Sequence, residues 1–167
     1  ANTLIAAKGN EVGKSLVEDS MLSVAAELLE NPKIIVPNFV IVSDNPDKPG
    51  RLTSIDSIEK NEAIFDVSPE SFADLEAILK SAGTILWNGP IGFFEKENFD
   101  KGTIKIAKMI CSSKGFSVAG GGDTIAAAQK AGVLGKLDYV STAGGAFLEF
   151  MEGKKLPGVE ALIDKVN

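Results

Sequence analysis

Residues 116–130, FSVAGGGDTIAAAQK, contain the pattern that decides the fold. Phe116 to Ala119 predict a short strand, three glycines follow, and a helix is predicted from about Asp123 to Lys130. A strand that enters a helix through such a turn is typical of a βαβ unit. Ligands of open parallel sheets bind at the carboxyl ends of the strands, so this turn is also a candidate site.

The same arrangement occurs on both sides of this stretch. Thr84 to Trp87 predict a strand that leads into a loop rich in glycine and proline, and Tyr139 to Ser141 predict another before Ala143-Gly144-Gly145. Helices are predicted from Ser68-Pro69 to about Lys80, near 99–113, and through Phe147 and Phe150. We therefore predict an α/β fold of three αβα layers around a mostly parallel, Rossmann-like sheet, in one domain spanning 1–167.

The N-terminal part gives weaker signals. A helix is predicted over Ala1–Lys8 with Gly9 at its end, and Ser15 with Glu18 has the spacing of a capping box. The expected elements that follow are a helix stopping at Asn31-Pro32, extended runs at 34–36 and 39–42, and a surface loop at 43–50.

Composition excludes several classes of function. The net charge is −6 and Arg51 is the only arginine, which argues against binding to nucleic acid or an anionic membrane. The absence of histidine removes the commonest general base and zinc ligand. The single cysteine, Cys111, cannot form an internal disulfide, and no signal-like start is present, so we expect a cytoplasmic protein.

Glycine-rich turns follow three predicted strands, at Asn88–Gly92, Gly120–Gly122 and Gly144-Gly145. Glycine lets a ligand approach the backbone closely. The start of the following helix attracts anions, and each such interaction contributes roughly 0.3–1 kcal/mol of binding free energy. One such turn is more often ordinary turn chemistry. Three at one edge of a sheet predict a site that binds phosphate through backbone amides.

Asp123 follows the central glycine turn and has two interpretations. It is either a helix cap or, beside bound phosphates, a ligand of a bridging Mg²⁺. A metal-free phosphate would be repelled by this carboxylate. The combination favours a magnesium nucleotide, with the Thr124 hydroxyl as a further contact.

Two stretches resemble other nucleotide-binding motifs but lack the spacing that those motifs require. Gly9, Gly13, Lys14 and Ser15 resemble a Walker A loop, but only three residues separate the glycines where that loop needs four. The triple glycine lacks the G-x-G-x-x-G spacing of a dinucleotide-binding Rossmann site, and no acidic residue closes a strand about 20 residues later.

Several motifs in series give the chain a family resemblance. In order and spacing it resembles the phosphoglycerate kinases, in their bacterial form, over essentially its whole length. The matching segments are 1–3, 12–16, 87–95 (WNGPIGFFE), 120–124 (GGGDT), 141–146 (STAGGA), 152–154 and 156–158.

The resemblance implies reversible phosphoryl transfer between 1,3-bisphosphoglycerate and ADP, giving 3-phosphoglycerate and ATP with Mg²⁺. It implies a two-lobed monomer, whose N-terminal lobe binds phosphoglycerate and whose C-terminal lobe binds nucleotide. This chain resembles most of the C-terminal lobe. Transfer from an acyl phosphate needs positioning and charge neutralisation more than acid–base groups, in keeping with the missing histidines.

The resemblance also implies roles for individual residues. Nucleotide phosphates and Mg²⁺ are expected at Gly121, Gly122, Asp123 and Thr124, and the transferring phosphoryl at Gly144 and Gly145, where Ala143 replaces a third glycine. Glu95 matches the carboxylate that holds the ribose hydroxyls. Lining the nucleotide are Asn88 and Pro90, and the expected apolar walls of the adenine pocket are Leu16, Phe65 and Phe93.

Other parts of the family pattern have no counterpart here. The glycines and methionine before Ala1, the phosphate-contacting lysines, the basic patch and the first strands of the sheet are missing from this sequence. We therefore expect a chain that is inactive alone. The alternative is a nucleotide-binding or scaffold domain without catalysis.

Overall fold

The computed structural model describes residues 1–163, which group into two compact units. The first unit comprises residues 1–78 and 91–106, and the second comprises 79–90 and 107 onward. Helices α3 (Ala73–Ser81) and α4 (Lys101–Ser112) each run from the first unit into the second. The prediction of one domain over 1–167 stays a prediction.

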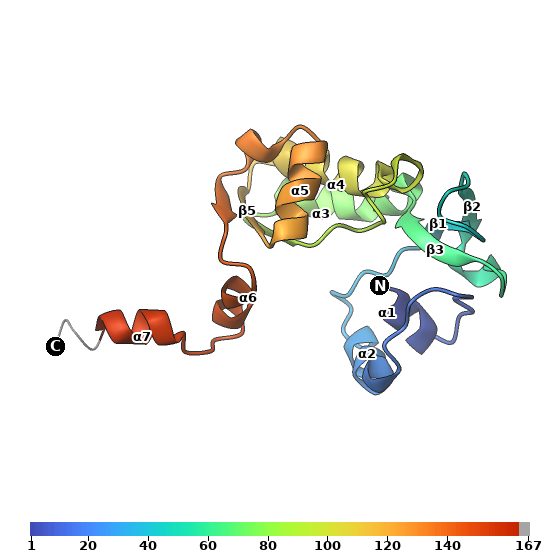
Figure 1. Cartoon of the computed structure of the whole chain (residues 1–167), viewed down its shortest axis with the longest axis horizontal. Helices are drawn as coiled ribbons and strands as arrows, with labels where there is room; N and C mark the ends of the chain where they lie inside the picture. Colours follow the sequence, from blue (N-terminus) through green and yellow to red (C-terminus); the bar gives the residue numbers. More distant parts are fainter. Residues whose placement is uncertain (164–167) are drawn as a thin grey trace. The chain divides into compact units, whose positions relative to one another are not determined.

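Two short helices begin the first unit and pack together (Figure 1). Helix α1 (Asn2–Ala7) ends before Gly9, whose φ of 88° confirms the predicted stop. Helix α2 (Leu22–Leu29) follows a 3₁₀ turn, η1 (Asp19–Met21), and has no side-chain cap. The predicted capping box is therefore wrong. The Ser15 hydroxyl instead donates to Val12 O in the local turn and accepts from Ile64 N, which tertiary packing brings into reach.

The first unit is built on an antiparallel sheet of strand order β2-β1-β3. Its strands are β1 (Phe39–Ser43), β2 (Arg51–Ser54) and β3 (Ala63–Val67). A 3₁₀ turn, η2 (Ile55–Ser57), lies between β2 and β3 in the chain. The run at 39–42 is thus confirmed as a strand, while the run at 34–36 forms none. The sequence did not predict β2 or β3. Val40 and Val42 on β1 are fully buried against Ile5 of α1.

Strand β3 leads into the helix that was predicted from Ser68. The Ser68 hydroxyl accepts from Glu70 N at 3.3 Å, Pro69 lies in the first turn of η3 (Pro69–Phe72), and α3 continues to Ser81. Serine at the cap and proline just inside the helix satisfy or remove backbone donors that lack helical partners.

A parallel sheet of order β4-β5-β6 forms the centre of the second unit. Its strands are β4 (Thr84–Asn88), β5 (Phe116–Gly120) and β6 (Tyr139–Ser141). Helix α4 follows a 3₁₀ turn, η4 (Glu97–Phe99), and connects β4 to β5. The later helical elements are α5 (Gly122–Lys130), η5 (Leu134–Lys136), α6 (Gly145–Met151) and α7 (Pro157–Ile163). Figure 1 shows α5 beside β5.

These elements confirm the α/β class and the parallel, Rossmann-like sheet flanked by helices. The strand pattern is that of βαβ units, in which each strand is followed by a helix. Over residues 1–163, no helix is both long and apolar enough to cross a membrane.

Candidate functional site

The three glycine-rich turns lie at one edge of the parallel sheet. Asn88 at the end of β4 pairs in register with Gly120 of β5, and Gly120 pairs with Ser141 of β6. The strands therefore end level with one another, and the turns that follow them share the carboxyl edge, as the sequence predicted.

Side chains tie the first two turns together. Asn88 Nδ2 donates to Gly120 O at 2.8 Å, and Thr124 Oγ1 donates to the same oxygen at 2.7 Å. Thr124 Oγ1 also accepts from Gly89 N at 2.7 Å, and the residue is 1% exposed. The hydroxyl proton of Thr124 is thus committed to the backbone, so this side chain holds the turns in place.

The turn after β5 contains a glycine with a positive φ. Gly121 has a φ of 95°, which L side chains rarely adopt, and it is the N-cap of α5 without any side-chain cap. The space where a Cβ of Gly122 would lie is open. Gly122 and Asp123 are exposed, and backbone amides at a helix start generally favour anions. Gly144 and Gly145 begin α6, a shorter helix of seven residues.

Asp123 lies in the first turn of α5 with an exposed side chain. Since Gly121 is the N-cap, Asp123 is not the capping residue, and within residues 1–163 its carboxylate has no hydrogen bond or ion pair. In the same range, no group of three or more metal-ligating side chains occurs. One free carboxylate fits Mg²⁺, which is commonly held by one or two carboxylates together with phosphates and water.

In the first unit, two of the expected adenine walls lie together. Phe65 of β3 and Phe93 have ring centroids 6.2 Å apart, and Phe93 N donates to Phe65 O at 2.7 Å. Both line a cavity of about 140 Å³, together with Asn2 and Ile5 of α1. Leu16 does not line this cavity and is 89% exposed, and Glu95 is exposed.

The predicted residues divide between the two units. In the first unit lie Leu16, Phe65, Phe93 and Glu95, and in the second lie Asn88, Pro90, Gly121, Gly122, Asp123, Thr124, Gly144 and Gly145.

Sequence reasoning missed two buried polar residues next to the aromatic pair. Asp66 on β3 and Thr103 on α4 are each 1% exposed. Burial raises the pKa of Asp66 to about 6, and the nearby Asp100 adds to the rise, while hydrogen bonds from Gly102 N and Val67 N oppose it. The available signal was a carboxylate inside the apolar run Ala63–Val67.

These features define an α/β protein whose parallel sheet carries glycine-rich turns at its carboxyl edge. A family profile described as phosphoglycerate kinase matches residues 1–154. The phosphoglycerate kinase of Coxiella burnetii is 44% identical over 95% of this chain, with a TM-score of 0.90. That of Pyrococcus horikoshii OT3 is 34% identical over 96% of the chain, with a TM-score of 0.81. The chain belongs to the phosphoglycerate kinase family.

The chain spans 43% of the length of the first of these structures and 42% of the second.

Proposed function

We propose that this chain provides the nucleotide side of a phosphoglycerate kinase. The reaction is reversible phosphoryl transfer between 1,3-bisphosphoglycerate and ADP, giving 3-phosphoglycerate and ATP, a step of glycolysis in the cytoplasm. The observation that carries the proposal is the unpaired Asp123 carboxylate at the sheet edge where the glycine-rich turns meet, in a chain of this family.

The second unit is assigned to the phosphates. Backbone amides of Gly121 and Gly122 bind them, and Asp123 holds Mg²⁺. Mg²⁺, when bound, neutralises charge on the nucleotide phosphates. Asn88 and Thr124 keep the turns in register, as their bonds to Gly120 O indicate.

Gly144 and Gly145 are assigned to the transferring phosphoryl through backbone amides, and Pro90 to the lining of the nucleotide. These three assignments rest on the family pattern. Seven residues make α6 a short helix, so its amides matter more here than its dipole.

The first unit is assigned to the base and the sugar. Phe65 and Phe93 form apolar walls for adenine in their shared cavity. Glu95 accepts from the ribose hydroxyls with its exposed carboxylate. Leu16 is assigned to adenine as well, and its high exposure in the free chain leaves it available to a ligand.

The competing function is a nucleotide-binding or scaffold domain that has no catalysis of its own. Two observations favour it. The chain spans only 43% of the length of the phosphoglycerate kinase of Coxiella burnetii, and its only arginine is occupied by an ion pair. Arg51 donates to both carboxylate oxygens of Glu62, at 2.8 and 2.7 Å, and so offers little to a phosphorylated acid.

Binding measurements on the purified chain test the assignment. By isothermal titration calorimetry we expect Asp123→Asn to weaken Mg·ADP binding by at least about tenfold and to leave adenosine binding unchanged. Glu95→Gln should weaken Mg·ATP binding but leave Mg·tripolyphosphate binding unchanged, because only the sugar contact is lost.

The exposed Asp74→Asn on α3 is the matched control and should bind as the unmodified chain does. Equal losses for adenosine and Mg·ADP in Asp123→Asn would contradict the metal role. Failure of the unmodified chain to bind Mg·ADP would contradict the proposed function itself.

A further inference from the structure

A buried carboxylate links β3 to the start of α4 by a hydrogen bond and packs against Gly92. Asp66 Oδ2 accepts from Gly102 N at 2.8 Å, at the start of α4, and Oδ1 accepts from Val67 N at 2.9 Å. A Cβ built on Gly92 or on Gly102 would collide with Asp66 Oδ1. The carboxylate, together with the backbone oxygens of Val67 and Phe99, therefore fills the space that side chains at residues 92 and 102 would otherwise occupy.

Thr103 holds the same region from the next position of α4. Its hydroxyl oxygen accepts from Ile91 N at 3.1 Å and from Gly92 N at 3.2 Å. Phe93 N then donates to Phe65 O on the neighbouring strand. Three successive amides, from Ile91 to Phe93, are thus fixed by β3 and by the first turn of α4.

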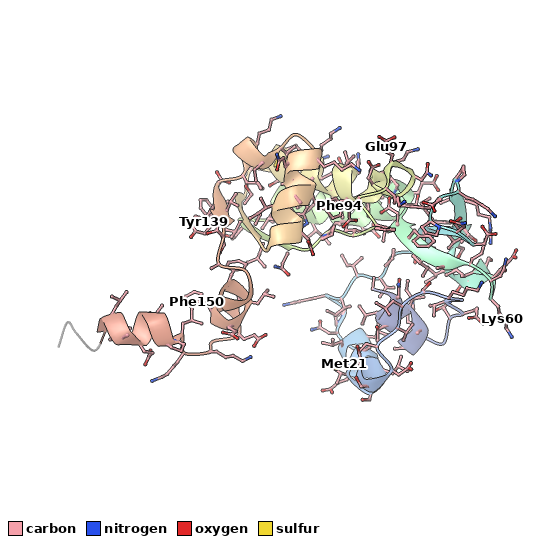
Figure 2. All side chains as sticks on the ribbon, viewed as in Figure 1. Met21, Lys60, Phe94, Glu97, Tyr139 and Phe150 are labelled. Carbon is pink, nitrogen blue, oxygen red and sulfur yellow. The ribbon has the colours of Figure 1, made fainter. Side chains whose placement is uncertain are left out.

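This fixed segment forms part of the wall of the aromatic cavity. Phe65, which precedes Asp66 on β3, and Ile91, Gly92 and Phe93 all line it. Figure 2 labels Phe94 and Glu97, which follow the segment toward α4, and the Phe94 side chain is buried at 7% exposure. The position of the Phe93 ring therefore depends on the bond to Phe65 O and on the bonds that Thr103, a residue outside the lining, makes to Ile91 and Gly92.

A carboxylate suits this place better than its neutral relatives. Both oxygens of Asp66 accept from backbone N–H groups, whereas an asparagine amide has one acceptor oxygen and would leave one buried donor without a partner. Burial disfavours the charged form of this carboxylate. The two backbone hydrogen bonds, and not its charge, therefore account for an aspartate at this position.

We propose that Asp66 and Thr103 form a clasp, the pair of side chains that positions the segment Ile91–Phe93 for the base of the nucleotide. The clasp acts through the segment and touches no phosphate. The inference rests on the proposed function for its ligand, but the geometry of the clasp is independent of it.

The sharpest test compares two variants of Thr103. Thr103→Val removes the acceptor for two amides and keeps the shape, whereas Thr103→Ser keeps the acceptor. We expect amide hydrogen exchange at Ile91 and Gly92 to rise by at least about tenfold in Thr103→Val and to stay within about twofold in Thr103→Ser. Asp66→Asn should raise exchange at Gly102 or Val67 in the same way.

The nucleotide part is tested on the same proteins with adenosine and with Mg·tripolyphosphate. Adenosine affinity should fall by about tenfold in Thr103→Val and Asp66→Asn, with tripolyphosphate affinity unchanged and Thr103→Ser near the unmodified chain. Asp74→Asn is again the control.

Each outcome decides one part. Unchanged exchange in Thr103→Val overturns the clasp, whatever the ligands do. Faster exchange with unchanged adenosine affinity overturns its role in the site. If the unmodified chain binds neither ligand, the nucleotide assignment fails while the exchange data still decide the clasp. Should Asp66→Asn lose protection throughout the first unit, the Thr103 pair decides alone.

Discussion

At the scale of single residues, burial opposes the ionisation of Asp66, although both oxygens of its side chain accept hydrogen bonds. Burial raises the pKa of this carboxyl to about 6, above the usual value of 3.8, and Asp100 contributes to the rise. The folded chain therefore binds a proton here more readily than the unfolded chain does. Stability from this group is complete below about pH 4 and is lost as the pH rises through about 6.

We expect this loss to appear as a difference between two proteins. Relative to Asp66→Asn, the free energy of unfolding of the unmodified chain should fall by up to about 3 kcal/mol between pH 4 and pH 7. Urea unfolding followed by far-ultraviolet circular dichroism measures it, and the comparison cancels the other carboxylates. A difference that stays constant with pH, or grows, would show that Asp66 is not the titrating group.

The residues proposed to contact ligands are easier to recognise in the sequence than those that support them. Asp123 and the glycines can be recognised from their local spacing, because a turn and a helix start are local structures. Thr124 was predicted as a ligand contact, yet its hydroxyl bonds Gly89 and Gly120. Ser15 likewise bonds Ile64, 49 residues away. Such partners follow from tertiary packing, which no local pattern encodes.

At the scale of elements, two glycines at the entrances of β4 and β5 have opposite surroundings. A Cβ on Gly115 would collide with the backbone of Ala82, whereas a Cβ on Gly83 would meet no atom within 4 Å. Neither residue has a positive φ, so alanine is compatible with the backbone at both. Phe116 N donates to Gly83 O at 2.9 Å, which brings the two entrances together.

Alanine at these two positions should therefore act in opposite directions. We expect Gly115→Ala to destabilise the second unit by about 1–3 kcal/mol through overpacking against backbone. Gly83→Ala should be neutral or stabilise by up to about 1 kcal/mol, because it restricts the unfolded chain. Trp87 is the only tryptophan and is buried in β4, so its fluorescence during urea unfolding reports this unit. Equal effects of the two substitutions would contradict the close approach.

The parallel sheet was predicted element by element, whereas the antiparallel sheet was largely missed. Strands β4, β5 and β6 are short apolar runs with glycine turns and helices between them. Strand β2, in contrast, has the sequence Arg-Leu-Thr-Ser, which has no strong strand pattern. It is a strand because it pairs with β1. Strand β3 contains Asp66, which breaks the apolar run.

At the scale of the whole molecule, the charge of the chain bears on the activity that we expect of it alone. It has a net charge of −6, and its one arginine is paired with Glu62. Stabilising a transferring phosphoryl group takes positive groups or metal, and losing such groups typically lowers the rate by orders of magnitude. The chain also covers less than half of the solved phosphoglycerate kinases, at 43% and 42%.

We therefore expect the chain alone to show no useful transfer from ATP to 3-phosphoglycerate in a coupled assay. Activity should appear when a separately produced chain covering the rest of a full-length phosphoglycerate kinase is added. The control omits this chain and keeps the added one. Appreciable activity of the 167-residue chain by itself would mean that the catalytic groups lie elsewhere than proposed.

The packing of Asp66 against Gly92 and Gly102 has a consequence for the history of the sequence. A Cβ at Gly92 would also collide with Phe99 O, and one at Gly102 would also collide with Val67 O, so loss of the carboxylate alone makes room for a side chain at neither position. Because backbone closes both sites as well, we expect the two glycines to persist even in distant relatives that replace the aspartate.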